Sequence, residues 1–134
     1  MEQQFYTEVL VYAKKCYHQI TELISLTEQL AEAVDRDDQV SVRMLISMRE
    51  EPIYKLRETE ALFHDTLLEW PAEEAAAARR ILEGGAPETA QEQAMTDAIA
   101  ANRRGLVRLI ELDQRNSRKL AGEKSFYASQ KPKE

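Results

Sequence analysis

Residues 47–58, SMREEPIYKLRE, decide whether the middle of this chain forms one long helix or two. They lie in a run with helical apolar spacing, yet Pro52 stands in its middle and Arg49 takes an apolar position. A proline inside a helix removes one backbone hydrogen bond and clashes with the preceding turn, at roughly 3 kcal/mol. The apolar stripe keeps its phase across the proline. We therefore favour a single kinked helix that extends from residue 40 to residue 70. The alternative is a helix that stops near residues 50–51 and a second helix with the proline in its first turn.

Other stretches of the chain carry helical patterns of their own. Residues 2–34 place apolar side chains every three or four positions, and an aspartate of residues 35–39, DRDDQ, is suited to cap the next helix. Residues 71–83, PAEEAAAARRILE, predict a short alanine-rich helix that ends at the glycine pair of residues 84–85. Residues 88–123 carry the apolar stripe of a last long helix.

These patterns predict an all-α fold, an elongated antiparallel bundle of three long helices plus one short helix. The first and last long helices are similar in length, since about 35 residues span roughly 50 Å. We therefore expect them to lie side by side and antiparallel. Residues 1–125 are expected to form a single domain. Residues 126–134, which end in the polar sequence ASQKPKE, are expected to form a flexible tail.

Composition argues against several classes of protein. The lone Cys16 cannot form an internal disulfide and fits a reducing cytosol. No signal-peptide pattern and no apolar run of about 20 residues is present, so we expect a cytoplasmic protein without a membrane span. His18 and His64 belong to no metal motif, and the chain has no phosphate-binding loop or nucleophile elbow. We therefore expect no enzyme activity, no metal and no cofactor.

Charge is distributed unevenly along the chain, whose net charge is −6. Residues 1–70 carry 14 acidic and 7 basic side chains, whereas residues 71–134 carry 10 and 11. Opposite charges beside a helix interface set partner choice and orientation, so we expect the basic last helix to pair with an acidic neighbour. Contact with nucleic acid is the less favoured interpretation, because the pI is about 5.1 and no aromatic residue interleaves the arginines.

Polar residues also fall at or beside the apolar stripes: Arg49, Glu60, Asn102, Asp113 and Asn116. One interpretation places them at the stripe's edge, where long side chains reach water. The other pairs Arg49 with Asp113 or Glu60 across the core, where a buried pair adds little stability but penalises shifted registers.

A kink at Pro52 would splay the bundle and leave an apolar groove that can receive an amphipathic helix of another protein. The expected partner-binding residues lie on the second and last long helices: Ile53, Leu56, Phe63, Leu106 and Leu109. Core packing is the competing interpretation for each of them.

Two stretches carry a family resemblance: a helix that follows DRDDQV and contains LISMREEPIYKLRE, and LVRLIELDQRNSRKL in the last helix. With these stretches the chain resembles the FliT family of flagellar export chaperones. The matching positions are Arg49, Ile53 and Leu56 on the second helix, and Ile110, Leu112 and Asp113 on the last. FlgN-type chaperones have the same helical build and are the nearest alternative.

This resemblance implies a small cytoplasmic bacterial chaperone that binds the C-terminal region of the filament-cap protein, or a hook-associated client, and keeps it unpolymerised until export. It also implies possible contact with the export machinery or with a transcription regulator. Two alternatives stay open. One is a self-associating helical scaffold, such as a homodimer. The other is a nucleic-acid-binding protein that uses Arg104, Arg108 and Arg115.

Overall fold

The computed structural model describes the backbone of residues 1–130 and the side chains of residues 1–122, and within these ranges it contains helices and no strand. The five helices are α1 (Gln3–Asp35), α2 (Gln39–Met48), α3 (Glu50–Glu69), α4 (Ala72–Leu82) and α5 (Ala90–Gln130). The predicted all-α class is confirmed. The backbone of residues 126–130, predicted to be part of a tail, belongs to α5. The rest of that predicted tail, residues 131–134, lies outside the described residues.

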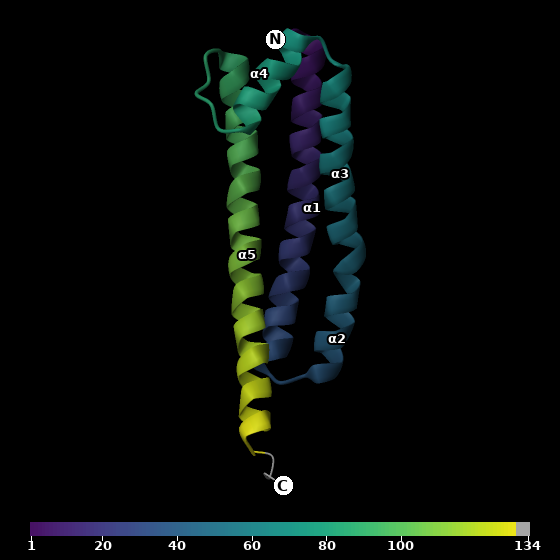
Figure 1. Cartoon of the computed structure of the whole chain (residues 1–134), viewed down its shortest axis with the longest axis vertical. Helices are drawn as coiled ribbons and strands as arrows, with labels where there is room; N and C mark the ends of the chain where they lie inside the picture. Colours follow the sequence, from purple (N-terminus) through teal and green to yellow (C-terminus); the bar gives the residue numbers. More distant parts are fainter. Residues whose placement is uncertain (131–134) are drawn as a thin grey trace.

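The helices form three long rods that lie side by side, with α1 in the middle (Figure 1). The helices α2 and α3 follow each other along one side of α1 and run antiparallel to it, while α5 runs along the other side. The short helix α4 lies at the end of the bundle where α3 stops and α5 starts. The described part of the bundle therefore has five helices, because two helices take the place of the predicted second long one.

The helices α1 and α5 run parallel, so the antiparallel pairing predicted for them is wrong. Asn102 binds Ala13 in the first half of both helices, and Arg115 binds Asp35 farther along both. The chain passes along α1, returns along α2 and α3, and passes again along α5 (Figure 1). With short connections, the first and third passes must point the same way. Similar length, on which the prediction rested, carries no information about direction.

Most helix ends follow local sequence signals. Asp38 caps α2, and its Oδ1 accepts a hydrogen bond from the backbone N–H of Ser41 at 3.1 Å. Trp70, which precedes a proline, has ψ 156° and ends α3. Gly84 adopts a φ of +94° after α4, a conformation that favours glycine. Thr89 accepts a hydrogen bond from the backbone N–H of Glu92 and so caps α5.

Arg49 separates α2 from α3, which places Pro52 in the first turn of α3. The structure thus has the interrupted arrangement and not the single kinked helix that we favoured. Proline has no N–H to donate to the carbonyl four residues earlier, which is the physical cause of the interruption. Arg49 nevertheless keeps helical angles (φ −79°, ψ −17°), and its carbonyl accepts from Ile53. The apolar stripe therefore keeps its phase across the break.

The core consists of three apolar clusters arranged along α1. The upper cluster contains side chains from α1, α3, α4 and α5: Val9, Phe63, Leu67, Ala78, Ile81, Met95 and Ile99. The middle cluster contains side chains from α1, α3 and α5: Cys16, Ile20, Leu23, Leu56 and Leu109. The lower cluster is formed mainly by α1 and α2: Leu30, Ala33, Val34, Val42 and Leu45. Four helices therefore meet only in the upper cluster.

Candidate functional site

The walls of the candidate site are α3 and α5, which pack against α1 far more than against each other. A cleft of about 410 Å³ lies between them, at the end of α4. Its floor comes from α1, and its lining is both apolar and polar: Tyr12, Cys16, Ile20, Glu60, His64, Arg79, Leu82, Glu83, Ile99, Asn102, Arg103 and Leu106. The cleft begins where α4 ends, so that α4 no longer packs as a fourth helix beside α1, α3 and α5.

The five predicted partner-binding residues divide between the middle and upper clusters. Leu56 and Leu109 are buried in the middle cluster, and Ile53 and Leu106 pack against it while remaining partly exposed. Phe63 belongs to the upper cluster, where its ring stacks on that of Tyr12 with centroids 4.0 Å apart. Of these five residues, Leu106 is the one that lines the cleft. The other four serve mainly as core in this structure.

Two of the polar residues on the stripes form one of the two ion pairs that we considered. The Nη2 of Arg49 lies 2.9 Å from Oδ1 of Asp113, which joins the α2–α3 junction to α5. The Arg49 side chain is 13% exposed and that of Asp113 is 41% exposed, so the bridge is buried on one side and open to water on the other. Glu60, the other partner considered for Arg49, lies in the cleft instead.

The two asparagines of this set each form one hydrogen bond, and each leaves a second buried polar atom without a partner among the described residues. Asn102 donates from Nδ2 to the backbone carbonyl of Ala13 at 3.0 Å. Asn116 is 3% exposed, and its Oδ1 accepts from Nη1 of Arg115 at 3.1 Å. The Asn102 contact ties α5 to α1 directly above the cleft floor. No sequence pattern predicts this contact, because its acceptor is a backbone atom.

The floor of the cleft carries protonated groups of low reactivity. Burial raises the pKa of the Tyr12 hydroxyl, with smaller contributions from the Cys16 thiol and the Glu60 carboxylate. Burial likewise raises the pKa of Cys16. A buried thiol with a raised pKa stays protonated near neutral pH and is a poor nucleophile. Within the described residues, no three His, Cys, Asp or Glu side chains are grouped as a metal ion would require.

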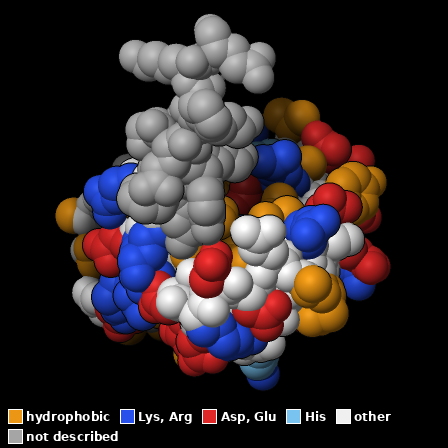
Figure 2. Space-filling model, turned by 90° about the horizontal axis from the view of Figure 1, so that it is seen from below, with side chains coloured by type: hydrophobic (Ala, Val, Ile, Leu, Met, Phe, Trp, Pro, Cys, Tyr) orange, Lys and Arg blue, Asp and Glu red, His pale blue; other side chains and the backbone are white. Residues whose placement is uncertain are grey.

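Some of the basic side chains of α5 pair with acidic side chains of α1. Arg115 and Lys119 both bind the carboxylate of Asp35, and Arg108 lies 3.9 Å from Glu28. Seen from below, blue side chains lie next to red ones on the part of this end that is not drawn in grey (Figure 2). These contacts favour the structural interpretation of the basic run over nucleic-acid binding.

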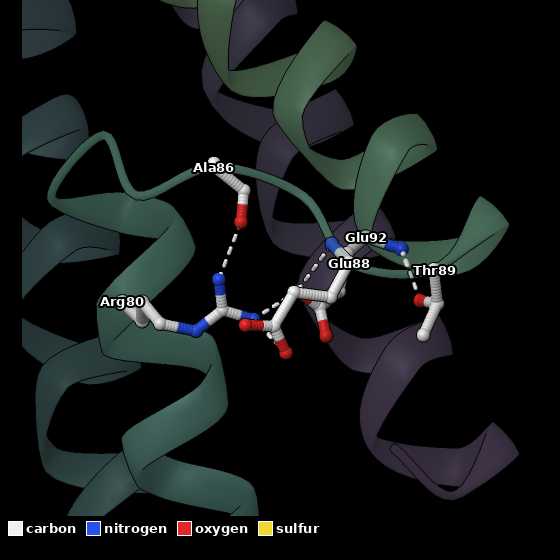
Figure 3. Close-up of polar contacts among 5 residues, drawn as sticks. All are labelled: Arg80, Ala86, Glu88, Thr89 and Glu92. Carbon is white, nitrogen blue, oxygen red and sulfur yellow. Dashed lines mark hydrogen bonds and ion pairs between the residues drawn. The ribbon is translucent and has the colours of Figure 1, made fainter.

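A polar cluster that we did not predict fixes the connection between α4 and α5 (Figure 3). Arg80 of α4 donates to the carbonyl of Ala86 and to the carboxylate of Glu92, and lies 3.8 Å from Glu88. Glu92 is 7% exposed, and it also accepts from the backbone N–H of Glu88. The sequence did contain a signal, because Thr89 and Glu92 have the spacing of a capping box. Arg80 thereby holds α4 against the start of α5, above the cleft.

Comparison with protein-family models, with curated proteins and with solved structures finds no match to this chain. Among the described residues, no helix has both the length and the apolar content needed to cross a bilayer.

Proposed function

We propose that this chain is a non-enzymatic helix-binding protein of the export-chaperone type, and that the cleft between α3 and α5 receives an amphipathic helix of a client protein. One observation carries the proposal: four helices complete the core only where α4 is present. Beyond the end of α4, no helix of the described residues takes the fourth position, and Leu106 and Ile53 are left partly exposed. A visiting helix would complete this position as α4 does in the upper cluster.

The dimensions of the open region suit a short helical segment. Arg103 contacts the end of α4, and Asp113 contacts Arg49, so these two residues of α5 bound the open region. Ten residues of helix separate them, or roughly 15 Å, which equals about three turns. Covering apolar surface stabilises a complex by about 25 cal/mol per Å², and the cost of ordering the client offsets much of this gain. Such binding is reversible, as a delivery step requires.

The client that we propose is the C-terminal region of a flagellar filament-cap protein or a hook-associated protein. This assignment rests on the resemblance to FliT at Arg49, Ile53, Leu56, Ile110, Leu112 and Asp113. A cytoplasmic location and contact with the export machinery follow from the same resemblance and belong to this proposal.

Calorimetric titration with the filament-cap and hook-associated proteins of the same genome tests this function. We expect saturable binding to one of them. Leu106→Glu should abolish it, because a carboxylate would enter the apolar part of the cleft. Val107→Glu is the matched control, since Val107 is 54% exposed and lies outside the cleft lining. Circular dichroism checks that both variants fold.

Equal binding by both variants would exclude the cleft as the client site. Absence of binding to every such protein would exclude the flagellar assignment. A purified chain that scatters light as a dimer and binds no client would favour the self-associating scaffold instead.

A further inference from the structure

A second groove, of about 320 Å³, lies between α1 and α3 and shares only Tyr12 with the lining of the cleft between α3 and α5. Two large apolar side chains stand at its middle, Val11 on the α1 side and Leu62 on the α3 side. Val11 is 62% exposed and Leu62 is 55% exposed. The groove therefore presents apolar surface to its surroundings at a place that the proposed client site does not use.

The hydroxyl groups along the α3 side of this groove are already hydrogen-bonded within the chain. Thr59 donates to the carbonyl of Lys55 at 2.9 Å, and Thr66 donates to the carbonyl of Leu62 at 2.8 Å. A polar group with an internal partner can lose its contact with water at little cost. Another surface can therefore cover this part of the groove without leaving these donors unpaired.

Charged side chains of opposite sign stand at the two ends of the groove. Glu8 precedes Val11 by three residues on α1, and Lys15 follows it by four. One carboxylate oxygen of Glu8 accepts a hydrogen bond from Nε1 of Trp70 at 3.1 Å, which leaves the other oxygen available. Lys15 is exposed and forms no ion pair or hydrogen bond with another described side chain.

We propose that this groove binds a second copy of the chain, turned by a twofold axis that passes between Val11 and Leu62 at right angles to the helices. A twofold interface requires a surface that is complementary to itself. On α1, this rotation places Glu8 of each copy opposite Lys15 of the other. On α3, Thr59 and Thr66 lie three and four residues from Leu62, so that hydroxyl faces hydroxyl and leucine faces leucine.

The size of the contact predicts a weak, reversible dimer. Because α1 begins at Gln3, two antiparallel copies centred on Val11 overlap over residues 3–19, or roughly 25 Å of helix. With neighbouring helices about 10 Å apart, the overlap covers about 500 Å² of each copy, and a total of about 1,000 Å² is at the low end for specific interfaces. The cleft between α3 and α5 remains accessible in such a dimer, since neither Val11 nor Leu62 lines it.

Sedimentation velocity of the full chain tests this interface. We expect a dimer at about 0.5 mM that dissociates on dilution to about 1 µM. Glu8→Lys and Lys15→Glu should each raise the dissociation constant at least about tenfold, because each replaces two attractive pairs with two like-charge pairs. An equal mixture of these two variants should dimerise again, because a chain with basic groups at both ends of the groove then meets a chain with acidic groups at both ends.

Glu32→Lys is the matched control, because Glu32 is exposed on α1 outside the groove and outside the overlap. It should dimerise as the wild type does, and circular dichroism checks that every variant folds. A wild-type chain that stays monomeric at about 0.5 mM would overturn the proposal. A dimer that neither single variant weakens, or variants that stay monomeric when mixed, would overturn the antiparallel pairing.

Titration of the client into Glu8→Lys separates this proposal from the proposed function. We expect unchanged client affinity, because Glu8 lies outside the cleft between α3 and α5. Client binding that is lost in both Glu8→Lys and Lys15→Glu would make the groove a site for another protein and overturn the dimer. A dimer that follows the expected charge rules but binds no flagellar client would support this interface and overturn the flagellar assignment.

Discussion

Replacing Gly105 by alanine tests how closely α5 approaches α1. A Cβ atom added at Gly105 would lie 2.8 Å from Cγ2 of Ile20 and 3.8 Å from Cδ1 of Ile24. Ile20 is 3% exposed, and its Cγ2 is a branch next to the backbone, so it cannot turn away freely. The two helices must separate, or the middle cluster must repack.

The expected magnitude follows from two opposed effects. Alanine in place of glycine inside a helix gains up to about 1 kcal/mol. Overpacking a well-filled core costs about 1–3 kcal/mol. We therefore expect Gly105→Ala to lower the free energy of unfolding by about 1 kcal/mol, which corresponds to roughly 3–5 °C in Tm for a chain of this size. Urea unfolding followed by circular dichroism measures the change.

Two matched variants make this experiment decisive. Gly122 lies in the same helix with nothing within 4 Å of an added Cβ, so Gly122→Ala should stabilise the protein. Ile20→Leu removes the Cγ2 methyl from the contact, and in that background the cost of Gly105→Ala should fall. If Gly105→Ala were as stabilising as Gly122→Ala, the close parallel approach of α1 and α5 would be refuted.

Three other perturbations test further contacts. Arg49→Met and Asp113→Asn should each lower the free energy of unfolding by about 1–2 kcal/mol, a value reduced because one side of the bridge is open to water. Additive losses in a double-mutant cycle would show that the two residues are not coupled. Arg80→Met should lower the thermal midpoint, because the α4–α5 connection loses its clamp, and an unchanged midpoint would contradict that role. Asp35→Asn should lower stability near neutral pH and have no such effect in strong acid, as urea unfolding at both pH values would show. Hydrogen bonds, first from Lys119, lower the pKa of Asp35. The contribution of Asp35 to stability is thus present above its pKa in the unfolded state and is lost as pH falls through its pKa in the folded state. If Asp35→Asn lowered stability equally at both pH values, this linkage would be contradicted.

Features governed by neighbouring residues could be predicted from the sequence. Asp38, Trp70 and Gly84 mark helix ends because capping, proline sterics and a positive φ depend on a few adjacent residues. The pairing of Arg49 with Asp113 was one of two pairings that the sequence suggested, beside the interpretation that these residues lie at the edge of the stripe. A charged residue on an apolar stripe needs a partner of opposite charge, but the stripe alone does not choose between Asp113 and Glu60.

Features governed by the path of the chain could not be predicted in the same way. The parallel direction of α1 and α5 follows from three passes joined by short connections, whereas the prediction used only the similar length of the two helices, which carries no information about direction. The Asn102 contact ends on a backbone carbonyl, which every residue possesses, so no pattern identifies it. Glu60 has stripe spacing like Arg49 but lies in the cleft, because its wall faces no helix at that level.

The bridge between Arg49 and Asp113 gives a reason for the cleft to stay open. An arginine that reaches an aspartate spans more distance than two apolar side chains in contact, so the bridge holds α3 and α5 apart. Replacing a buried ion pair with apolar residues is often neutral or stabilising. We therefore expect the double variant Arg49→Met with Asp113→Leu to be at least as stable as wild type in urea.

That stable variant should bind clients less well, because its walls can close over Ile53 and Leu106 and leave less space for a visiting helix. Titration of the same client into wild type and variant measures the loss. Reduced binding together with equal or greater stability would mean that the ion pair is kept for function at some expense of stability. Undiminished binding by a fully folded double variant would refute this role, since the spacing of α3 and α5 would then be set by their packing on α1 alone.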